Sequence, residues 1–257
     1  MKLPFETEGV DKIGRSRFAV ILIRPDSHEN IGLVARGMKN TGFADLRLVG
    51  IDGLEPEAWR TAVHAEDILD NARFYPDLAA ATKSLHLVFA STARVRKKFA
   101  ILTFPEALET VLRFPLDTRI GLLFGKERTG LTGEELGSAN FIYSIPQAVR
   151  QPSYNLASAV LLSLFGLFGR SAEGAFPREE LPLLRRDQDD CIRVILMKLE
   201  KTGFIHATNR THITRKVQDI FGRIALTDKD RKLLMAIFNK SVERVYRPCL
   251  PGNQEKD

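Results

Sequence analysis

The sequence predicts an α/β protein with a mostly parallel sheet flanked by helices, followed by a small all-helical extension. Short apolar runs alternate with helical patterns over the first 150 residues, and four of these runs are apolar almost throughout. Strands that are covered on both faces of a parallel sheet have this continuous apolar character. The last third of the chain shows helical patterns only.

Five apolar runs have the length of buried strands, and helical patterns separate them. Strands are expected at 18–23, 46–50, 85–90, 121–124 and 141–145. Helices are expected near 30–42, 56–63, 76–83, 104–113 and 132–137, and a strongly apolar helix at 154–170. Because ligands of parallel sheets bind beyond the carboxyl ends of the strands, the loops after these strands are the candidate sites.

A change in composition after residue 170 divides the chain. Residues 1–170 are expected to form the α/β domain, 171–186 a linker and 187–257 a basic helical extension. Residues 178–247 hold 16 Lys and Arg against 10 Asp and Glu, which accounts for the net charge of +6. A basic segment suits a polyanionic partner, although a solvated helical surface would have the same composition. Helices are expected in this part at 187–203, 211–222 and 228–246.

Composition also narrows the class of protein. No run approaches the roughly 20 apolar residues of a membrane-spanning helix, and the charged N-terminus lacks the apolar stretch of a signal peptide. We therefore expect a cytoplasmic protein. The two cysteines, Cys191 and Cys249, match neither a zinc-binding spacing nor a disulfide framework, and no metal is expected.

The segment FGKERTGL (124–131) follows an apolar strand and contains Gly125-Lys126, which invites comparison with a phosphate-binding loop. The nucleotide-binding motif requires a glycine and a hydroxyl where this chain has Ile120 and Glu127, so the motif is absent. The glycines after the first strand do not form the dinucleotide-binding signature either. A nucleoside triphosphate and a nicotinamide cofactor are both disfavoured.

Two further segments at strand ends carry polar groups. ASTARVRKKF (90–99) contains four cations that suit phosphate binding, although a solvated basic loop explains them as well. IPQAVRQPSYNLASAV (145–160) places Ser153 and Asn155 at the start of the apolar helix, where a serine is by default an N-cap. Neither segment defines a function by itself.

In this order, NIGLVARGMKNTGF, LLFGKERTGLTGEEL and IPQAVRQPSYNLASAV resemble the three motifs of the SpoU branch of the SPOUT RNA 2′-O-ribose methyltransferases. The resemblance covers most of residues 17–168. STARVR, AVHAEDIL and KTGFI are similar to segments of the TrmJ type, which modifies tRNA in the anticodon loop. The resemblance implies a C-terminal trefoil knot in the α/β domain, a homodimer, and S-adenosylmethionine as the methyl donor.

The resemblance also implies roles for individual residues. Arg36 matches the arginine that acts on the 2′-hydroxyl, while Asn30 and Glu127 would hold Arg36 and the ribose, and Ser153 and Asn155 would lie near the methyl donor. A guanidinium stays protonated, so we expect Arg36 to bind the neighbouring phosphate and position the hydroxyl. Either that phosphate or a transiently neutral Arg36 would accept the proton.

The remaining implied roles concern the cofactor and the RNA. Gly125 would let the backbone approach the cofactor closely. The residues expected to bind the cofactor are Ala90, Ser91, Thr92, Phe124, Gly125, Glu127, Ser144, Ile145, Ser153 and Leu156. The residues expected to bind RNA are Arg94, Arg96, Lys97, Lys98 and Arg150.

We therefore expect a tRNA 2′-O-methyltransferase that modifies C or U at nucleotide 32. The alternatives are a SpoU-type enzyme acting on rRNA or another tRNA position, and a catalytically silent RNA-binding factor. The joint presence of all five motif residues argues against a silent protein. Arg150 stands where TrmJ-like sequences commonly carry an acidic residue, which leaves the base preference open.

Overall fold

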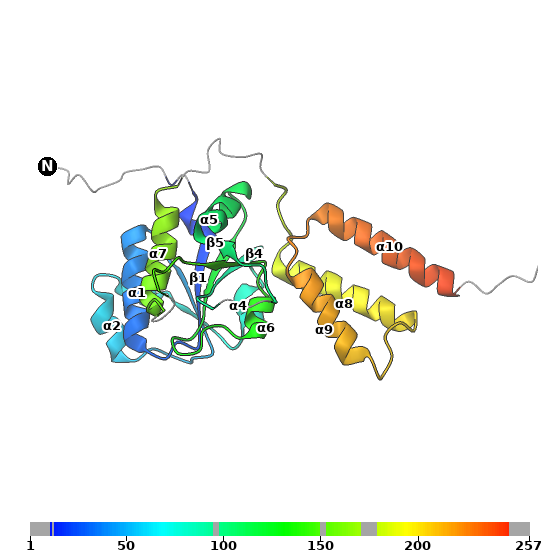
Figure 1. Ribbon diagram of the computed structural model, residues 1–257, viewed down its shortest axis with the longest axis horizontal. Helices are drawn as coiled ribbons and strands as arrows, with labels where there is room; N and C mark the ends of the chain where they lie inside the picture. The colour runs from blue at the N-terminus through cyan, green and yellow to red at the C-terminus, as the bar shows by residue number, and fades with distance from the viewer. Residues whose placement is uncertain (1–10, 12, 95–97, 150–152, 171–178, 247–257) are drawn as a thin grey trace, which may run out of the picture.

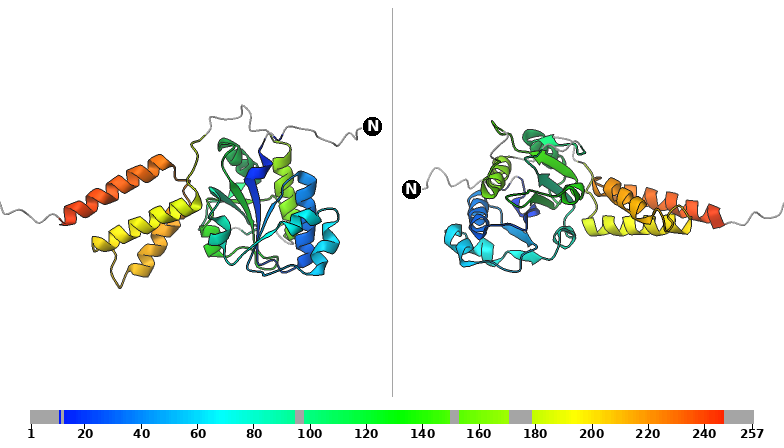
Figure 2. Two further views of the ribbon diagram at one scale, coloured as in Figure 1. Left: turned by 180° about the vertical axis from the view of Figure 1, so that it is seen from behind. Right: turned by 60° about the horizontal axis from the view of Figure 1, so that its bottom comes forward.

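The computed structural model describes residues 11, 13–94, 98–149, 153–170 and 179–246 of the 257-residue chain. The described part consists of an α/β domain and three long helices that extend from one side of it (Figure 1). The same arrangement is visible from behind and in an oblique view with the bottom turned forward (Figure 2).

Within the described residues, seven strands form one sheet in the order β3-β2-β1-β6-β4-β7-β5, and all neighbouring strands are parallel. Because the strands share one direction, their carboxyl ends lie at a single edge of the sheet. The strands are β1 (Phe18–Ile23), β2 (Asp45–Val49), β3 (Arg73–Tyr75), β4 (Leu87–Ser91), β5 (Leu102–Thr103), β6 (Ile120–Phe124) and β7 (Phe141–Ser144).

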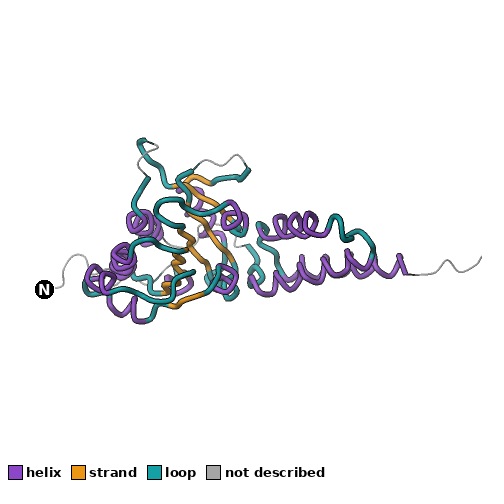
Figure 3. Tube along the Cα trace, turned by 90° about the horizontal axis from the view of Figure 1, so that it is seen from below, coloured by secondary structure: helices purple, strands orange, loops and turns teal. Residues whose placement is uncertain are grey.

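Helices cover both faces of the sheet, so that the strands lie between two helical layers (Figure 3). Successive residues of a strand point to opposite faces, and Val20 and Ile21 of β1 accordingly belong to different apolar clusters. One face packs against α1 (His28–Thr41), α2 (Pro56–Ala62), α3 (Glu66–Asp70), α5 (Phe104–Arg113) and α7 (Leu156–Phe168), and the other against α4 (Leu78–Thr82) and α6 (Gly133–Gly137). A short 3₁₀ helix, η1 (Arg15–Arg17), precedes β1.

The predicted α/β class with a mostly parallel sheet is confirmed. Three short elements, β3, β5 and α3, were not expected from the sequence. β3 is largely exposed at the edge of the sheet and includes Arg73, so it has no apolar run to reveal it. The expected strand at 85–90 begins at Leu87, because the Leu85 backbone N–H donates to Thr82 in the preceding turn.

α1 packs closely against two other helices at its glycines. A Cβ on Gly32 would lie 2.0 Å from the carbonyl oxygen of Ala58 in α2, so that only glycine fits there. Gly37 faces Leu161 of α7, and a Cβ on this glycine would lie 3.5 Å from the Leu161 side chain. The three helices thus form one layer whose outer surface includes the exposed residues of α1 and α7.

The C-terminal extension consists of α8 (Arg185–Lys201), α9 (Arg210–Gly222) and α10 (Asp228–Tyr246). It is joined to the α/β domain by a buried polar contact. Asn140 donates from its side chain to the carbonyl oxygens of Gly222 and Ile224, and the buried Arg185 side chain donates to Gly222 at 3.1 Å. These bonds hold the end of α9 beside the loop that leads into β7.

α8 begins two residues before its expected start at 187, and residues 171–178 of the expected linker lie outside the described residues. The boundaries of the two domains therefore stay a prediction. Within the described part of the chain, no helix is long and apolar enough to cross a membrane.

Candidate active site

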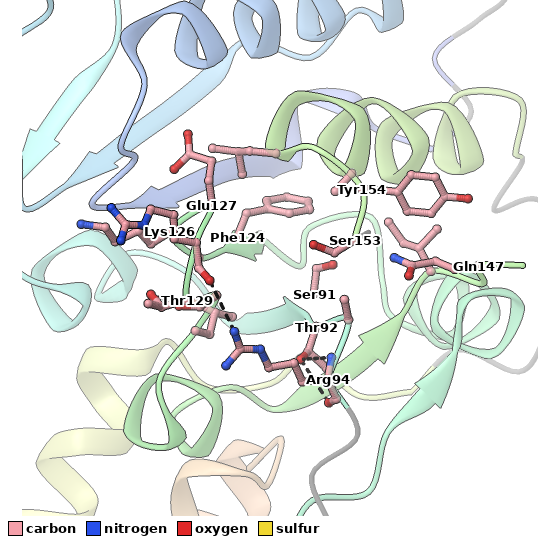
Figure 4. A pocket seen from close by; sticks show the side chains of 18 residues that line it. Ser91, Thr92, Arg94, Phe124, Lys126, Glu127, Thr129, Gln147, Ser153 and Tyr154 are labelled. Carbon is pink, nitrogen blue, oxygen red and sulfur yellow. Dashed lines mark hydrogen bonds between the residues drawn. The ribbon is translucent and has the colours of Figure 1, made fainter. Parts of the chain in front are cut away.

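A hollow of about 760 Å³ opens at the carboxyl ends of β4, β6 and β7, where a parallel sheet offers its binding site (Figure 4). Three of the four segments singled out in the sequence line it, and they come from distant parts of the chain. The lining residues are Ser91, Thr92, Ala93, Arg94, Phe124, Gly125, Lys126, Glu127, Arg128, Thr129, Gly130, Leu131, Ile145, Gln147, Ser153, Tyr154, Leu156 and Ala159.

The wall after β6 is a tight turn that folds back on the strand end. The Gly130 backbone N–H donates to the Lys126 carbonyl at 2.7 Å, and Gly130 has a φ of +68°. A Cβ on Gly125 would lie 2.4 Å from the backbone nitrogen of Leu131. Gly125 thus makes room for the returning chain of its own turn, and its expected role in letting the backbone approach a cofactor stays a prediction.

Glu127 is held by three N–H donors from the start of α1. Its Oε2 accepts from the backbone N–H of Asp26 at 2.7 Å. Its Oε1 accepts from the backbone N–H of Ser27 at 3.3 Å and from Nδ2 of Asn30 at 2.8 Å. The carboxylate thereby fastens the loop after β6 to the loop after β1, and a negative charge at the N-terminus of α1 is electrostatically favourable.

Asn155 extends this contact to α7. Its Nδ2 donates to Oδ1 of Asn30 at 3.0 Å, while its Oδ1 accepts from the Ala157 backbone N–H at 2.8 Å and caps α7. The N-cap is therefore Asn155 and not Ser153, which had been the default expectation. Asn155, Asn30 and Glu127 form a continuous hydrogen-bonded chain, called the relay below, that joins the three sequence motifs.

Ser153 lines the hollow together with Ser91 (Figure 4). Beneath this wall, the hydroxyls of Tyr143 in β7 and Ser163 in α7 are hydrogen-bonded at 2.9 Å. Burial raises the pKa of Tyr143 to about 12, so the phenol stays protonated and ties α7 to the sheet.

Three basic residues, Arg94, Lys126 and Arg128, line the hollow. Lys126 forms an ion pair with Asp26 at 2.7 Å, and Arg94 donates to the Arg128 carbonyl at 3.4 Å. Arg128 is an exposed residue of the same turn.

Arg36 lies apart from the other predicted catalytic residues. It is exposed on α1, and within the described residues it makes no hydrogen bond or ion pair. Asn30 and Glu127 bond to each other and do not hold Arg36 within this chain. The reason is helical geometry, because six residues separate Asn30 from Arg36, which is about 9 Å along the helix axis and about two-thirds of a turn out of phase.

Most residues expected to bind a cofactor do line the hollow. The exceptions are Ser144 and Ala90, the latter fully buried in the sheet. Gln147 and Tyr154 also line the hollow, from the segment before α7, and were not predicted from the sequence. Tyr154 donates from its hydroxyl to the Pro146 carbonyl at 3.1 Å, a contact that no sequence pattern announces.

The residues expected to bind RNA are only partly described. Arg94 lines the hollow, and Lys98 forms an ion pair with Asp219 of α9 at 3.7 Å. Arg96, Lys97 and Arg150 lie outside the described residues. Among the side chains that the structure places, no group of three or more His, Cys, Asp or Glu residues could hold a metal ion.

Comparison with known proteins gives one family. The model of the SpoU rRNA Methylase family matches residues 17–165, which include the hollow and the relay. The chain is 37% identical over 154 residues to the uncharacterized tRNA/rRNA methyltransferase LasT of Escherichia coli, covering 59% of this chain and 68% of LasT. It is 33% identical over 218 residues to the tRNA (cytidine-2'-O-)-methyltransferase TrmJ of Methanocaldococcus jannaschii, covering 77% of this chain and 94% of that protein.

The similarity extends to the three-dimensional structure. The crystal structure of TrmJ from Z. mobilis ZM4 superimposes with a TM-score of 0.74 at 28% sequence identity. The superposition covers 87% of this chain and 98% of that one, so it includes much of the helical extension as well as the sheet.

Proposed function

We propose that this chain, which belongs to the SpoU rRNA Methylase family and is a methyltransferase of the TrmJ type, methylates the ribose 2′-oxygen of tRNA. The relay is the observation that carries this proposal. It brings one residue from each of the three family motifs together at the edge of the hollow. A protein that had kept the fold without the reaction would not need all three.

The hollow fits S-adenosylmethionine, which would supply a methyl group activated by its sulfonium centre. About 760 Å³ lies within the usual range for ligand sites of about 300–1,000 Å³. Phe124 and Leu156 offer apolar surface, and Ser91 and Ser153 offer hydroxyls. These side chains, with the backbone of the surrounding loops, would hold the methyl donor.

The protein's own contribution is positioning. The ribose 2′-oxygen must gain the methyl group and lose its proton, and the gain from orienting two reactants is large. Arg36 would bind the phosphate beside the target ribose and place the hydroxyl, as the family motif implies. The proton would pass to that phosphate or to a transiently neutral Arg36, while the relay fixes the walls of the site.

Arg36 would reach a site through a homodimer. It sits on the outer surface of α1 beside Leu33, which is 41% exposed, and next to Gly37, which packs on α7. On α7, Leu161 is 41% exposed and Phe165 is 66% exposed. Exposed apolar surface of this kind marks an interaction site, which a second copy of the chain would bury. In such a homodimer, each copy would bring its own Arg36 to the partner's hollow.

The helical extension would bind the body of the tRNA with its excess of basic residues, and residues 1–170 would form the catalytic domain. A trefoil knot belongs to this proposal through the family resemblance. A tRNA substrate would place the protein in the cytoplasm.

C or U at nucleotide 32 is the proposed target. The TrmJ of Pectobacterium atrosepticum is described as acting on cytidine and uridine, at 28% identity over 238 residues. The experiment that tests the proposal is a map of 2′-O-methylation in tRNA and rRNA from cells with and without this protein. Loss of one methyl group at nucleotide 32 supports it, and unchanged tRNA with a lost rRNA methyl group would move the substrate to the ribosome.

A further inference from the structure

A second hollow lies where α9 meets the edge of the sheet. It has a volume of about 410 Å³ and is called the α9 groove here. Its apolar walls are Phe99 and Leu102 from the sheet edge, Phe141 of β7, and Ile220 and Ile224 from the end of α9. Ile220 is 50% exposed and Ile224 is 43% exposed, so the groove is open to solvent.

The rim of the α9 groove is cationic. Arg223 lines it and donates to the Asp219 carbonyl at 2.7 Å. Lys98 lies 5.6 Å from the centre of the Phe99 ring and 3.7 Å from the Asp219 carboxylate. Lys216, which is exposed one helical turn before Ile220, adds a third cation on the same face of α9. One acid among three bases leaves this rim positive.

The Asn140 side chain lines the groove and is already hydrogen-bonded within the protein. Its Nδ2 donates to Gly222 and Ile224, and its Oδ1 accepts from the Val88 backbone N–H at 2.9 Å. A ligand would therefore be recognised by its flat apolar faces and its negative charge, with little reading of its polar edges. An unstacked nucleobase with its phosphates has this chemistry.

We propose that the α9 groove binds one unstacked nucleobase of the RNA substrate, with Phe99 as the stacking partner and Lys98 and Arg223 at the adjacent phosphates. This inference rests on the proposed function, since it takes the substrate to be RNA. Because the polar groups of Asn140 are occupied, the groove accepts any base.

The position of the groove suits a nucleotide near the target. Arg94 lines the active-site hollow and Phe99 lines the α9 groove, and they are five residues apart. Five residues span at most about 18 Å, a separation that a few nucleotides can bridge. The groove thus joins the two basic segments of the sequence, the loop after β4 and the extension, into one path for the RNA.

The test measures binding of unmodified tRNA to the full-length protein as a function of salt. Phe99→Leu keeps an apolar side chain but removes the ring, and Ile224→Ser removes the opposite wall from an exposed position. Each should raise the Kd for tRNA about 5- to 100-fold, the range that corresponds to loss of one base stacked on an aromatic ring. Phe99→Tyr keeps the ring and should bind tRNA within about twofold of the wild type.

The salt dependence of tRNA binding distinguishes the contribution of base stacking from that of phosphate contacts. Phe99→Leu should shift the plot of log K against log salt without changing its slope, whereas Lys98→Ala and Arg223→Ala should each reduce the slope by about one. At saturating tRNA, Phe99→Leu should methylate at the wild-type rate with a raised KM. Leu116→Ser is the matched control, since Leu116 is 39% exposed near the amino end of β6, away from the groove.

Three outcomes would contradict the proposal that the α9 groove binds a nucleobase. Wild-type Kd in both Phe99→Leu and Ile224→Ser, with thermal unfolding and S-adenosylmethionine binding unchanged, would overturn it. A change of oligomeric state in sedimentation caused by Ile224→Ser would show that a second copy of the chain covers this surface. If the wild type neither binds nor methylates tRNA, the proposed function fails with it, whereas active wild type with unaffected groove variants refutes the groove alone.

Discussion

Asn30 donates a hydrogen bond from Nδ2 to Oε1 of Glu127 across 2.8 Å, although 97 positions separate the two residues in the chain. Its Oδ1 accepts at the same time from Asn155. Both ends of the Asn30 amide are therefore engaged, which fixes its orientation. The relay couples the loop after β1, the turn after β6 and the start of α7. A change in the position of one segment should therefore shift the other two.

Replacing Glu127 should damage both stability and activity. Glu127→Ala leaves the N–H groups of Asp26 and Ser27 without their acceptor, which we expect to cost about 1–3 kcal/mol in the free energy of unfolding. Methyl transfer to tRNA should fall at least about tenfold, because a displacement of about 1 Å in a positioned site can cost more than that. Chemical denaturation and transfer of labelled methyl measure the two effects, with exposed Glu109→Ala of α5 as the control. Full activity in Glu127→Ala would mean that the relay has no part in the reaction.

Asn155 offers a way to separate capping from the relay. Asn155→Ala removes both and should lower the free energy of unfolding by about 0.5–2 kcal/mol. Asn155→Asp keeps the acceptor that caps α7 but cannot donate to Asn30, so the helix should keep most of its stability while methyl transfer falls as far as in Asn155→Ala. If Asn155→Asp transfers methyl at the wild-type rate, the cap alone explains why an asparagine is needed there.

Gly125→Ala tests the fit of the turn after β6. Its Cβ would meet the backbone of Leu131 at 2.4 Å, and backbone atoms cannot move aside as a side chain does. We expect a loss of about 1–3 kcal/mol in the free energy of unfolding together with weaker binding of S-adenosylmethionine. Gly53→Ala is the control, because a Cβ there would have no neighbour within 4 Å. Calorimetric binding and thermal unfolding decide the outcome.

Arg36→Ala should abolish methyl transfer while leaving the free energy of unfolding within about 0.5 kcal/mol of the wild type, since Arg36 is exposed. Mixing this variant with Glu127→Ala tests whether Arg36 serves the partner's site. A mixed dimer would then contain one site with both changes and one intact site, and random mixing should restore about a quarter of the wild-type activity. No recovery, with mixed dimers demonstrated by mass spectrometry, would place both residues in the same subunit's site.

His86 should make stability depend on pH. Burial and the positive charge of Arg119 lower its pKa from 6.5 to about 4, and its Nδ1 accepts from the Arg119 backbone N–H at 2.9 Å. Between these pH values the unfolded chain binds a proton that the folded chain does not, so stability is full above about pH 6.5 and falls as the pH drops toward 4. His86→Asn keeps an acceptor at the δ position without titrating near neutral pH. Urea unfolding at several pH values should show a smaller decline for this variant than for the wild type.

The central strands and the long helices could be predicted because their signals are local. β1 was expected at the bounds it has, and so was α5. β3 and β5 could not be predicted, because they are short and form only through pairing with β2 and β7, which a local sequence pattern does not reveal. An edge strand of two residues carries no periodicity to read.

The site shows the same division. The three motifs identified which segments meet, but the partners of each side chain depend on geometry between segments. That Asn30 binds both Glu127 and Asn155 follows from the way three loops fold against one another. Arg36 shows most clearly what the sequence could not predict. It belongs to the same motif as Asn30, yet the two side chains do not meet within one chain.

The strand order has a consequence for how the protein is made. β1 lies between β2 and β6, and its pairing with β6 joins Phe18 to Ile120. During synthesis at about 5–20 residues per second, β1 waits roughly 5–20 s for that partner to leave the ribosome. The nascent chain therefore carries one open edge of a fully apolar strand, and the ribosome-bound intermediate up to residue 119 is the stage at which we expect chaperones to bind.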